Sequence, residues 1–454
     1  MTVPTTDRHP LRVGLNLLYL LPGIVGGTET YAAGLVRGLA EVDDGLEYVV
    51  FLNRESADWP LPDIPAFQRV VCPVRASSRV RRLLYEQFRL PALARRHGVD
   101  VLHSLGYVAP VLGRCPGVVT IHDMNTKGHG RSMPLFKRLT LAFLVRLSAR
   151  AARQVITVSE FSRQEIHRHL GLPLERIHVV HEAPLPPEWG RSSESARQEE
   201  SSQPVSWAST FQPSLKSDTP YILAFASQSP HKNIPRLIEA FARIATSVPH
   251  HLVLAGHLPG DGAVDRAIGR WDIAHRVRLT GYLPRPEVDR LLSEAALFAF
   301  PSLYEGFGLP VLEAQAAEVP VACANRGALP EVAGEGAVFF DPENALDMAA
   351  TLAHALTDED LRANLIALGR LNLERFSWTE AARQTLNIYA RAAWRGRNRY
   401  VGSPAYSSAV PAHGALMRSL DNPPGASSEI AEGDFSLDDQ SLPPPRARIK
   451  PEHP

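Results

Sequence analysis

Cysteine is scarce in this sequence. The 454 residues include only Cys72, Cys115 and Cys323, and none of them belongs to a C-x-x-C pair. We therefore expect a reducing compartment, with neither a disulfide framework nor a structural zinc site. Long apolar runs are also lacking. The first residues hold no apolar signal core, and no stretch approaches the roughly 18 apolar residues that cross a bilayer. These absences predict a cytoplasmic protein.

An excess of charge of one sign is absent as well. The sequence contains 48 Lys and Arg residues and 48 Asp and Glu residues, which gives a formal net charge of zero. A protein that binds nucleic acid through its phosphates usually carries a basic surplus. We therefore expect no nucleic-acid partner.

Several catalytic fingerprints are missing. The glycine-rich segment at residues 22–27 fits neither the dinucleotide-binding G-x-G-x-x-G pattern nor a P-loop, which argues against a nicotinamide dehydrogenase. Ser159 does not lie in a G-x-S-x-G turn, and we expect it to cap a helix. We interpret Thr357 and Asp360 as a capping box rather than as part of a metal site. The sequence predicts no metal and no other cofactor.

Alternating strand and helix patterns fill most of the chain. Apolar strands are expected at residues 11–18, 48–53, 70–74, 99–104, 117–122, 221–226, 251–256, 277–283, 297–300, 321–324 and 337–340. Helical patterns separate them, including one over residues 79–96. This alternation predicts the α/β class with doubly wound parallel sheets, in which ligands gather at the carboxyl ends of the strands.

Shifts in composition divide the chain. We expect an N-terminal extension at residues 1–10, a first Rossmann-like domain at 11–185, and a linker rich in Ser, Glu and Pro at 186–218. A second Rossmann-like domain follows at 219–375. A closing helix occupies 376–395, and the Pro- and Ser-rich tail at 396–454 is predicted to be disordered.

The stretch at residues 298–315, FAFPSLYEGFGLPVLEAQ, carries the clearest signal. A buried strand leads into a loop in which Gly306 and Gly308 allow close approach of a ligand, and Pro310 suits the first turn of the following helix. The free N–H groups at that helix start favour an anion such as phosphate. Glu305 and Glu313, with seven residues between them, can reach different parts of one extended ligand.

Other loops sit where ligands are expected. Gly26 and Gly27 follow the first strand, and Thr28 is expected to cap the next helix. His122 and Asp123 end the strand at residues 117–122, where they form either a local hydrogen-bonded pair or part of a site. Lys232 lies in the loop SQSPHKN after the strand at 221–226, where it is either solvated or directed toward the same crevice.

These motifs, taken together and in order, resemble glycosyltransferase family 4. The similarity rests on GGTETY, the strand-end His-Asp, PHKN and PSLYEGFGLPVLEA, and spans residues 11–394. It implies the GT-B fold, in which two Rossmann-like domains face a central cleft and the last helix crosses back to the first domain. The domain at 11–185 would bind the acceptor, and the domain at 219–375 would bind the donor. It also implies transfer of a sugar, often mannose, from a nucleotide-diphosphate donor to a glycan or lipid-linked acceptor. Retention of configuration and independence of metal are implied in the same way.

The resemblance also assigns roles to individual residues. Lys232 would neutralise the departing diphosphate, Glu305 would orient the sugar hydroxyls, and Glu313 would hold the ribose diol. His122 and Asp123 would lie beside the reacting sugar. The remaining donor-binding residues would be Gly26, Gly27, Asn233, Tyr282, Leu283, Gly306, Phe307, Gly308 and Leu309.

The sequence departs from the family at Ser227. Many relatives carry an Arg at about this place, as a second cation on the diphosphate. In this sequence the function of that Arg would pass to His231 or to a residue of the first domain. A GT-B sugar-nucleotide epimerase or phosphorylase, and an inactive nucleotide-sugar-binding protein, therefore stay open as alternatives.

A basic amphipathic helix is expected at residues 135–153, with a second basic cluster at Arg75, Arg79, Arg81 and Arg82. Such a helix either packs on the core with a charged outer face, which is the commoner case, or lies on an anionic membrane surface. Peripheral contact at the inner membrane face therefore stays open.

Overall fold

The computed structural model describes residues 10–24, 26–42, 45–113, 115–124, 135–186, 219–227, 229–258 and 262–394, without the side chains of residues 135–138. The predicted tail at 396–454 lies outside these residues, as do all but the end positions of the N-terminal extension and of the linker. Lys137 and Arg138 of the basic helix are likewise outside the described side chains.

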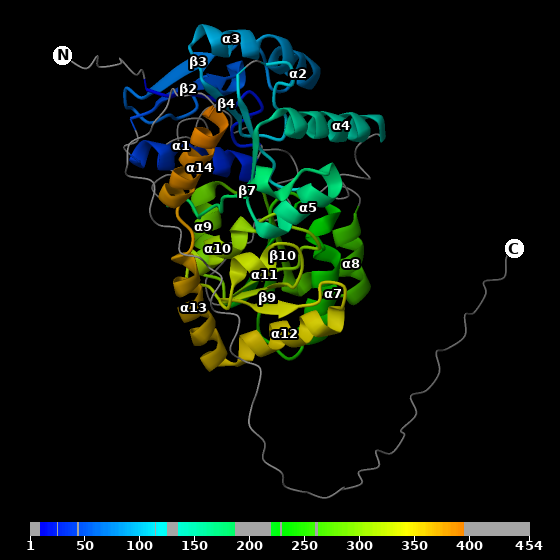
Figure 1. Ribbon diagram of the computed structural model, residues 1–454. Coiled ribbons are helices and arrows are strands. Elements are labelled where there is room, and N and C mark those ends of the chain that lie inside the picture. The colour runs from blue at the N-terminus through cyan, green and yellow to red at the C-terminus, as the bar shows by residue number, and fades with distance from the viewer. Residues whose placement is uncertain are drawn as a thin grey trace, which may run out of the picture. The chain divides into compact units, whose positions relative to one another are not determined.

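The first sheet holds seven parallel strands in the order β3-β2-β1-β4-β5-β6-β7. The strands are β1 (Arg12–Asn16), β2 (Glu47–Leu52), β3 (Phe67–Val71), β4 (Val101–Ser104), β5 (Gly117–Thr120), β6 (Gln154–Thr157) and β7 (Ile177–Val179). The connecting helices are α1 (Gly27–Glu41), α2 (Arg79–Phe88), α3 (Leu90–Arg96), α4 (Leu135–Ala151) and α5 (Glu160–Leu170), with short 3-10 turns at Arg54–Ser56 and Leu174–Arg176 (Figure 1).

The second sheet holds six parallel strands in the order β10-β9-β8-β11-β12-β13. The strands are β8 (Tyr221–Phe225), β9 (His251–Ala255), β10 (Val277–Gly281), β11 (Leu297–Phe300), β12 (Val321–Ala324) and β13 (Val338–Phe340). The helices are α7 (Ile234–Ile244), α8 (Ala263–Trp271), α9 (Arg285–Ser293), α10 (Leu309–Ala316), α11 (Leu329–Ala333), α12 (Ala345–Thr357), α13 (Glu359–Leu373) and α14 (Trp378–Ala393), with 3-10 turns at Pro230–Lys232 and Ala274–Arg276.

The predicted pair of parallel α/β sheets is confirmed. Central strands such as β11 and β12 are buried at every position, as expected for strands covered on both faces. Strand order reverses between β1 and β4 in the first sheet and between β8 and β11 in the second. The loops that follow β1, β8 and β11 therefore lie at the switch points where α/β sheets bind ligands.

Two predicted helix caps were wrong. Helix α1 is capped by Gly26, whose φ is 58°, so Thr28 lies within the first turn. Helix α13 is capped by Asp358, whose carboxylate accepts from the Leu361 N–H at 2.9 Å. Thr357 instead ends α12, and its hydroxyl donates to the Ala353 carbonyl at 2.9 Å. Thr within a helix commonly makes this backward bond, which removes the hydroxyl from capping.

The helix predicted over residues 79–96 is divided in two. Helix α2 ends at Phe88 and α3 begins at Leu90, with Pro91 in its first turn. Proline lacks the N–H that would continue the hydrogen bonds of the preceding helix, so a new helix begins there.

The closing helix α14 packs against the first domain, as predicted. Its Trp378 lies directly over Gly34 and Gly38 of α1. Farther along, the Tyr389 hydroxyl lies 2.7 Å from Nδ1 of His103 on β4. Burial, with His122 nearby, lowers the pKa of His103 to about 3, so this ring is neutral at physiological pH.

Replacement of Gly34 tests this packing. A Cβ atom at Gly34 would overlap the Trp378 ring, so we expect Gly34→Ala to destabilise the fold by about 1–3 kcal/mol or more. Gly269 on α8 is the control, because nothing lies within 4 Å of its added Cβ. Gly269→Ala should leave stability unchanged or raise it by about 1 kcal/mol. Equal effects of the two substitutions in urea unfolding would contradict the packing described.

Glu86 predicts a pH dependence of stability. It points inward from α2, is 2% exposed, and burial raises the pKa of its carboxyl to about 7. Between pH 4.5 and 7 the folded chain therefore holds a proton that the unfolded chain loses, and stability falls as pH rises. Glu86→Gln should remove this loss. The free energy of unfolding of Glu86→Gln, relative to that of the parent, should rise by on the order of 3 kcal/mol from pH 4 to pH 8. A difference that does not change with pH would refute the raised pKa of Glu86.

Candidate active site

The loops after β5 and β11 meet at Gly306. A Cβ atom at this residue would lie 2.6 Å from the His122 carbonyl oxygen and 2.6 Å from the Asp123 Cβ, so no larger residue fits without displacement. The Gly306 carbonyl accepts from Ser159 Oγ at 2.6 Å. Ser162 Oγ lies 3.0 Å from this carbonyl and 3.0 Å from that of His122. The loops that follow β5 and β11 therefore come together between the two domains.

The helix start after this loop has the predicted form. Gly308 caps α10 with φ 110°, and Pro310 lies in the first turn. The N–H groups of Phe307, Gly308 and Leu309 lie at the start of the helix, where no helical carbonyl is available to accept from them. The side chains of Phe307 and Leu309 are buried in a core cluster to which both domains contribute, so these residues can meet a ligand only through their backbone.

Lys232 and Glu305 form an ion pair. Lys232 Nζ lies 2.7 Å from Glu305 Oε1 and 4.8 Å from the centroid of the Phe300 ring. Both side chains keep limited exposure, at 20% and 15%. The predicted phosphate cation and the predicted sugar-binding carboxylate are therefore adjacent.

Asn233 fixes the turn that carries Lys232. Its φ is 57°, and its side-chain amide donates to the carbonyls of Pro301 at 3.2 Å and Pro342 at 2.7 Å. The donor group of the Asn233 side chain is thus used in hydrogen bonds within the protein. Ser227 accepts a hydrogen bond from the Ser229 N–H at 3.2 Å, within the loop that precedes this turn.

Glu313 pairs with an arginine that sequence reasoning missed. Arg285 Nη1 lies 2.6 Å from Glu313 Oε1, while its Nε binds Asp289 Oδ1 at 2.7 Å. Burial acts to lower the pKa of Arg285, but the two carboxylates outweigh it and raise the pKa. Arg285 begins α9, 28 residues before Glu313, and no local pattern signals such a pair.

His122 is nearly buried and held by the protein from both sides. Its Nε2 lies 3.2 Å from the Leu105 carbonyl, and its Nδ1 lies 3.4 Å from Glu182 Oε1. The Tyr31 ring packs edge-on against the imidazole, with centroids 4.7 Å apart. Glu182 is itself buried and was missed by sequence reasoning, because it falls in the segment interpreted as leading to a domain boundary.

The remaining predicted residues take separate positions. Asp123 accepts from the Tyr107 hydroxyl at 3.1 Å. Gly26 and Gly27 begin α1, at the switch point of the first sheet. Tyr282 and Leu283 follow β10; the Tyr282 ring stacks on His257 at 5.5 Å, and Leu283 packs against the second-domain core.

Glu331 of α11 joins the two domains. Its carboxylate accepts from the N–H groups of Glu160 at 2.8 Å and Phe161 at 3.1 Å, at the start of α5, and lies 3.2 Å from His181 Nε2. Burial opposes ionisation, but these partners prevail and lower the pKa of Glu331. A carboxylate at a helix N-terminus is favoured by the helix dipole.

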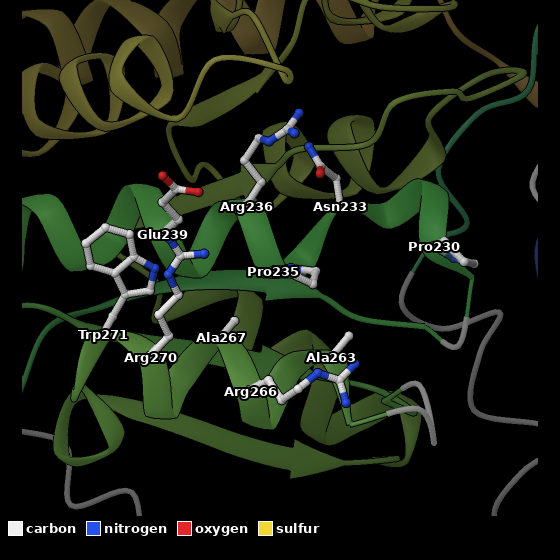
Figure 2. Close-up of a pocket in the computed structure, with 10 residues that line it drawn as sticks. All are labelled: Pro230, Asn233, Pro235, Arg236, Glu239, Ala263, Arg266, Ala267, Arg270 and Trp271. Atoms are coloured by element: carbon white, nitrogen blue, oxygen red, sulfur yellow. The ribbon is translucent and has the colours of Figure 1, made fainter. Parts of the chain in front are cut away.

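A separate groove lies between α7 and α8. Its volume is about 560 Å³. Figure 2 shows Arg236, Arg270 and Trp271 in its lining. Asn233 borders it, but Lys232, Glu305 and Glu313 do not line it. Among the described residues, no group of three or more His, Cys, Asp or Glu side chains is placed to hold a metal. Within the same residues, no helix has the length and apolarity to span a bilayer.

Comparison with known families gives two matches. The model described as glycosyl transferases group 1 matches residues 205–371, and the model described as glycosyltransferase family 4 matches residues 25–183. O-antigen chain mannosyltransferase B of Escherichia coli is 29% identical over 280 residues, which cover 60% of this chain and 69% of that protein. The MMP alpha-(1->4)-mannosyltransferase of Mycolicibacterium hassiacum is 31% identical over 325 residues, with coverage of 66% and 72%.

A solved structure with a similar fold is HepE of Anabaena in complex with UDP and glucose. The TM-score is 0.60 at 18% identity, and the match covers 84% of this chain and 100% of HepE. Similarity at this level establishes the GT-B architecture that the sequence predicted.

Gly306 provides a direct test of the contact between the domains. We expect Gly306→Ala to push the two loops apart and to lower stability by about 1–3 kcal/mol. Radius of gyration from X-ray scattering should rise with it. Gly117→Ala is the control, because its Cβ would meet only Ala152 at 3.6 Å, an ordinary contact. An unchanged radius and stability for Gly306→Ala would show that the loops do not touch as described.

Proposed function

The chain belongs to the group 1 glycosyl transferases of glycosyltransferase family 4, and we propose that it transfers mannose from a nucleotide-diphosphate donor to a hydroxyl of a growing polysaccharide or lipid-linked glycan. The mannosyltransferases of Escherichia coli and Mycolicibacterium hassiacum support the choice of sugar. HepE, solved with UDP and glucose, supports a nucleoside-diphosphate donor.

The observation that supports the proposal most is the Lys232–Glu305 pair beside the start of α10. A nucleotide-sugar carries a diphosphate next to sugar hydroxyls, and Lys232 Nζ lies 2.7 Å from the Glu305 carboxylate, so a cation and a hydrogen-bond acceptor stand side by side. The α10 N–H groups add partial positive charge on the same loop. One donor can therefore use both members of the pair at once.

Each residue has a distinct part in the proposed reaction. Lys232 and the α10 N–H groups stabilise the diphosphate as negative charge develops on it. Glu305 accepts hydrogen bonds from sugar hydroxyls once the donor phosphate takes over Lys232. Glu313, oriented by Arg285, accepts from the ribose diol. His122 and Asp123 border the sugar from the first domain.

The bond between the anomeric carbon and the diphosphate oxygen breaks, and a bond from that carbon to the acceptor oxygen forms. The acceptor proton passes to the departing diphosphate, so charge and atoms balance. This course needs no metal when fixed donors stabilise the leaving group. We further propose that the product keeps the anomeric configuration, as the sequence resemblance implies.

The test is nucleotide release from UDP-, GDP- and ADP-sugars, with and without glycoside and polyprenyl-linked acceptors. We expect GDP-mannose to be used, with release that rises when an acceptor is added. Lys232→Ala should lower kcat/KM by on the order of 100-fold, because a charge on the leaving group loses its partner. Arg243→Ala is the control: it removes an exposed cation from α7 that pairs with Glu239 and lies over the Trp271 ring, and that is not a residue of the candidate site.

The other outcomes separate the alternatives. Turnover of Lys232→Ala at the parental rate would remove Lys232 from the mechanism. Product formed without an acceptor would indicate an epimerase, and a requirement for inorganic phosphate would indicate a phosphorylase. Thermal stabilisation by one nucleotide without any release would indicate a binding protein.

A further inference from the structure

Helix α2 presents an apolar stripe to solvent. Val80, Leu84 and Phe88 are spaced four residues apart and are 71%, 53% and 63% exposed. The opposite side of the same helix carries Glu86, which is buried. This is the reverse of the usual arrangement of a surface helix, which turns its apolar stripe to the core. An exposed apolar patch of this kind marks an interaction surface.

Helix α4 also presents exposed apolar residues. Leu139 and Phe143 are four residues apart, and both are more than half exposed. The two helices flank one loop, because Gln87 of α2 donates to the Ala109 carbonyl at 3.0 Å and Ser148 of α4 donates to the same carbonyl at 3.1 Å. Figure 1 shows α2 and α4 at the same end of the first domain. We name Val80, Leu84, Phe88, Leu139 and Phe143 the α2–α4 surface.

The charge around the α2–α4 surface is of one sign. Exposed Arg79 and Arg81 alternate with its apolar residues on α2, and exposed Arg146 and Arg150 lie farther along α4. The only acidic residue in either helix is Glu86, which is buried. The chain as a whole carries no net charge, so this surplus is local.

The composition of the surface identifies its partner. Apolar side chains that enter the acyl boundary, flanked by arginines at the level of the headgroups, suit an anionic bilayer. A symmetric contact with a second copy would place the same arginines against each other, which is unfavourable. We propose that the α2–α4 surface docks on a bilayer that contains anionic lipids.

Docking also bears on the reaction. Helix α4 begins 12 residues after Asp123, a residue of the candidate site. A lipid-linked acceptor would then be presented from the bilayer that the enzyme already occupies. This last step rests on the proposed function, whereas vesicle binding does not.

The experiment is co-sedimentation of the full chain with vesicles of phosphatidylcholine alone and of phosphatidylcholine mixed with phosphatidylglycerol. We expect binding to the anionic vesicles and little to the neutral ones. The double variant Leu84→Ser with Phe88→Ser should lower the partition coefficient at least about tenfold. Arg79→Glu with Arg81→Glu should abolish the preference for the anionic lipid.

Leu346→Ser with Leu371→Ser is the matched control. These residues are 63% and 61% exposed on α12 and α13 of the second domain, so the change in apolar surface is similar but lies elsewhere. The control should bind vesicles as the parent does. All variants should keep nucleotide release with a soluble acceptor, because none alters a residue of the candidate site.

Three results would overturn the proposal. One is equal binding of the parent to neutral and anionic vesicles, or to neither. Another is parental binding by the Leu84→Ser, Phe88→Ser variant. The third is a dimer of the parent in sedimentation velocity that the same variant loses, which would assign the surface to a second copy. Vesicle binding without glycosyl transfer would refute the proposed function alone.

Discussion

The close approach of two backbones at Gly306 is the constraint on which the site depends. His122 and Asp123 belong to one sheet and the loop before α10 to the other, and they meet only because this position lacks a side chain. The serine hydroxyls of Ser159 and Ser162 then bridge the loops. Glu331 adds a carboxylate from the second domain to the start of α5. Small changes at this seam would therefore alter the site without touching a ligand-binding group.

Charges in the site are arranged in pairs before any substrate is considered. Glu305 has Lys232 and Glu313 has Arg285, so neither of these poorly exposed carboxylates is an isolated charge. An isolated buried charge would cost several kcal/mol. Pairing therefore lets the fold hold the two carboxylates close to where a polar ligand needs them. A donor with its own negative charge can exchange partners with these pairs rather than create new ones.

Much of this architecture was predictable because its causes are local. Buried parallel strands need apolar runs, and a helix that begins with Gly308 and Pro310 can be inferred from those two residues. The pairing of Arg285 with Glu313 was not predictable, because it depends on how α9 packs beside α10. Glu182 was missed for a similar reason. The errors at Thr28 and Thr357 arose where a neighbouring residue could cap the helix equally well, and local geometry decided between them.

The hydrophobic core beneath the closing helix draws on both domains. Phe307, Leu312 and Val332 come from the second domain, yet they pack in one cluster with Tyr31 of α1 and Trp378 of α14. The boundary between the two domains in the sequence therefore does not coincide with the limits of this hydrophobic core. A chimera that exchanged the second domain at the linker would inherit a mismatched half of this cluster. Recombination with a relative would have to keep α10, α11 and α14 together with α1, because all four contribute to this cluster.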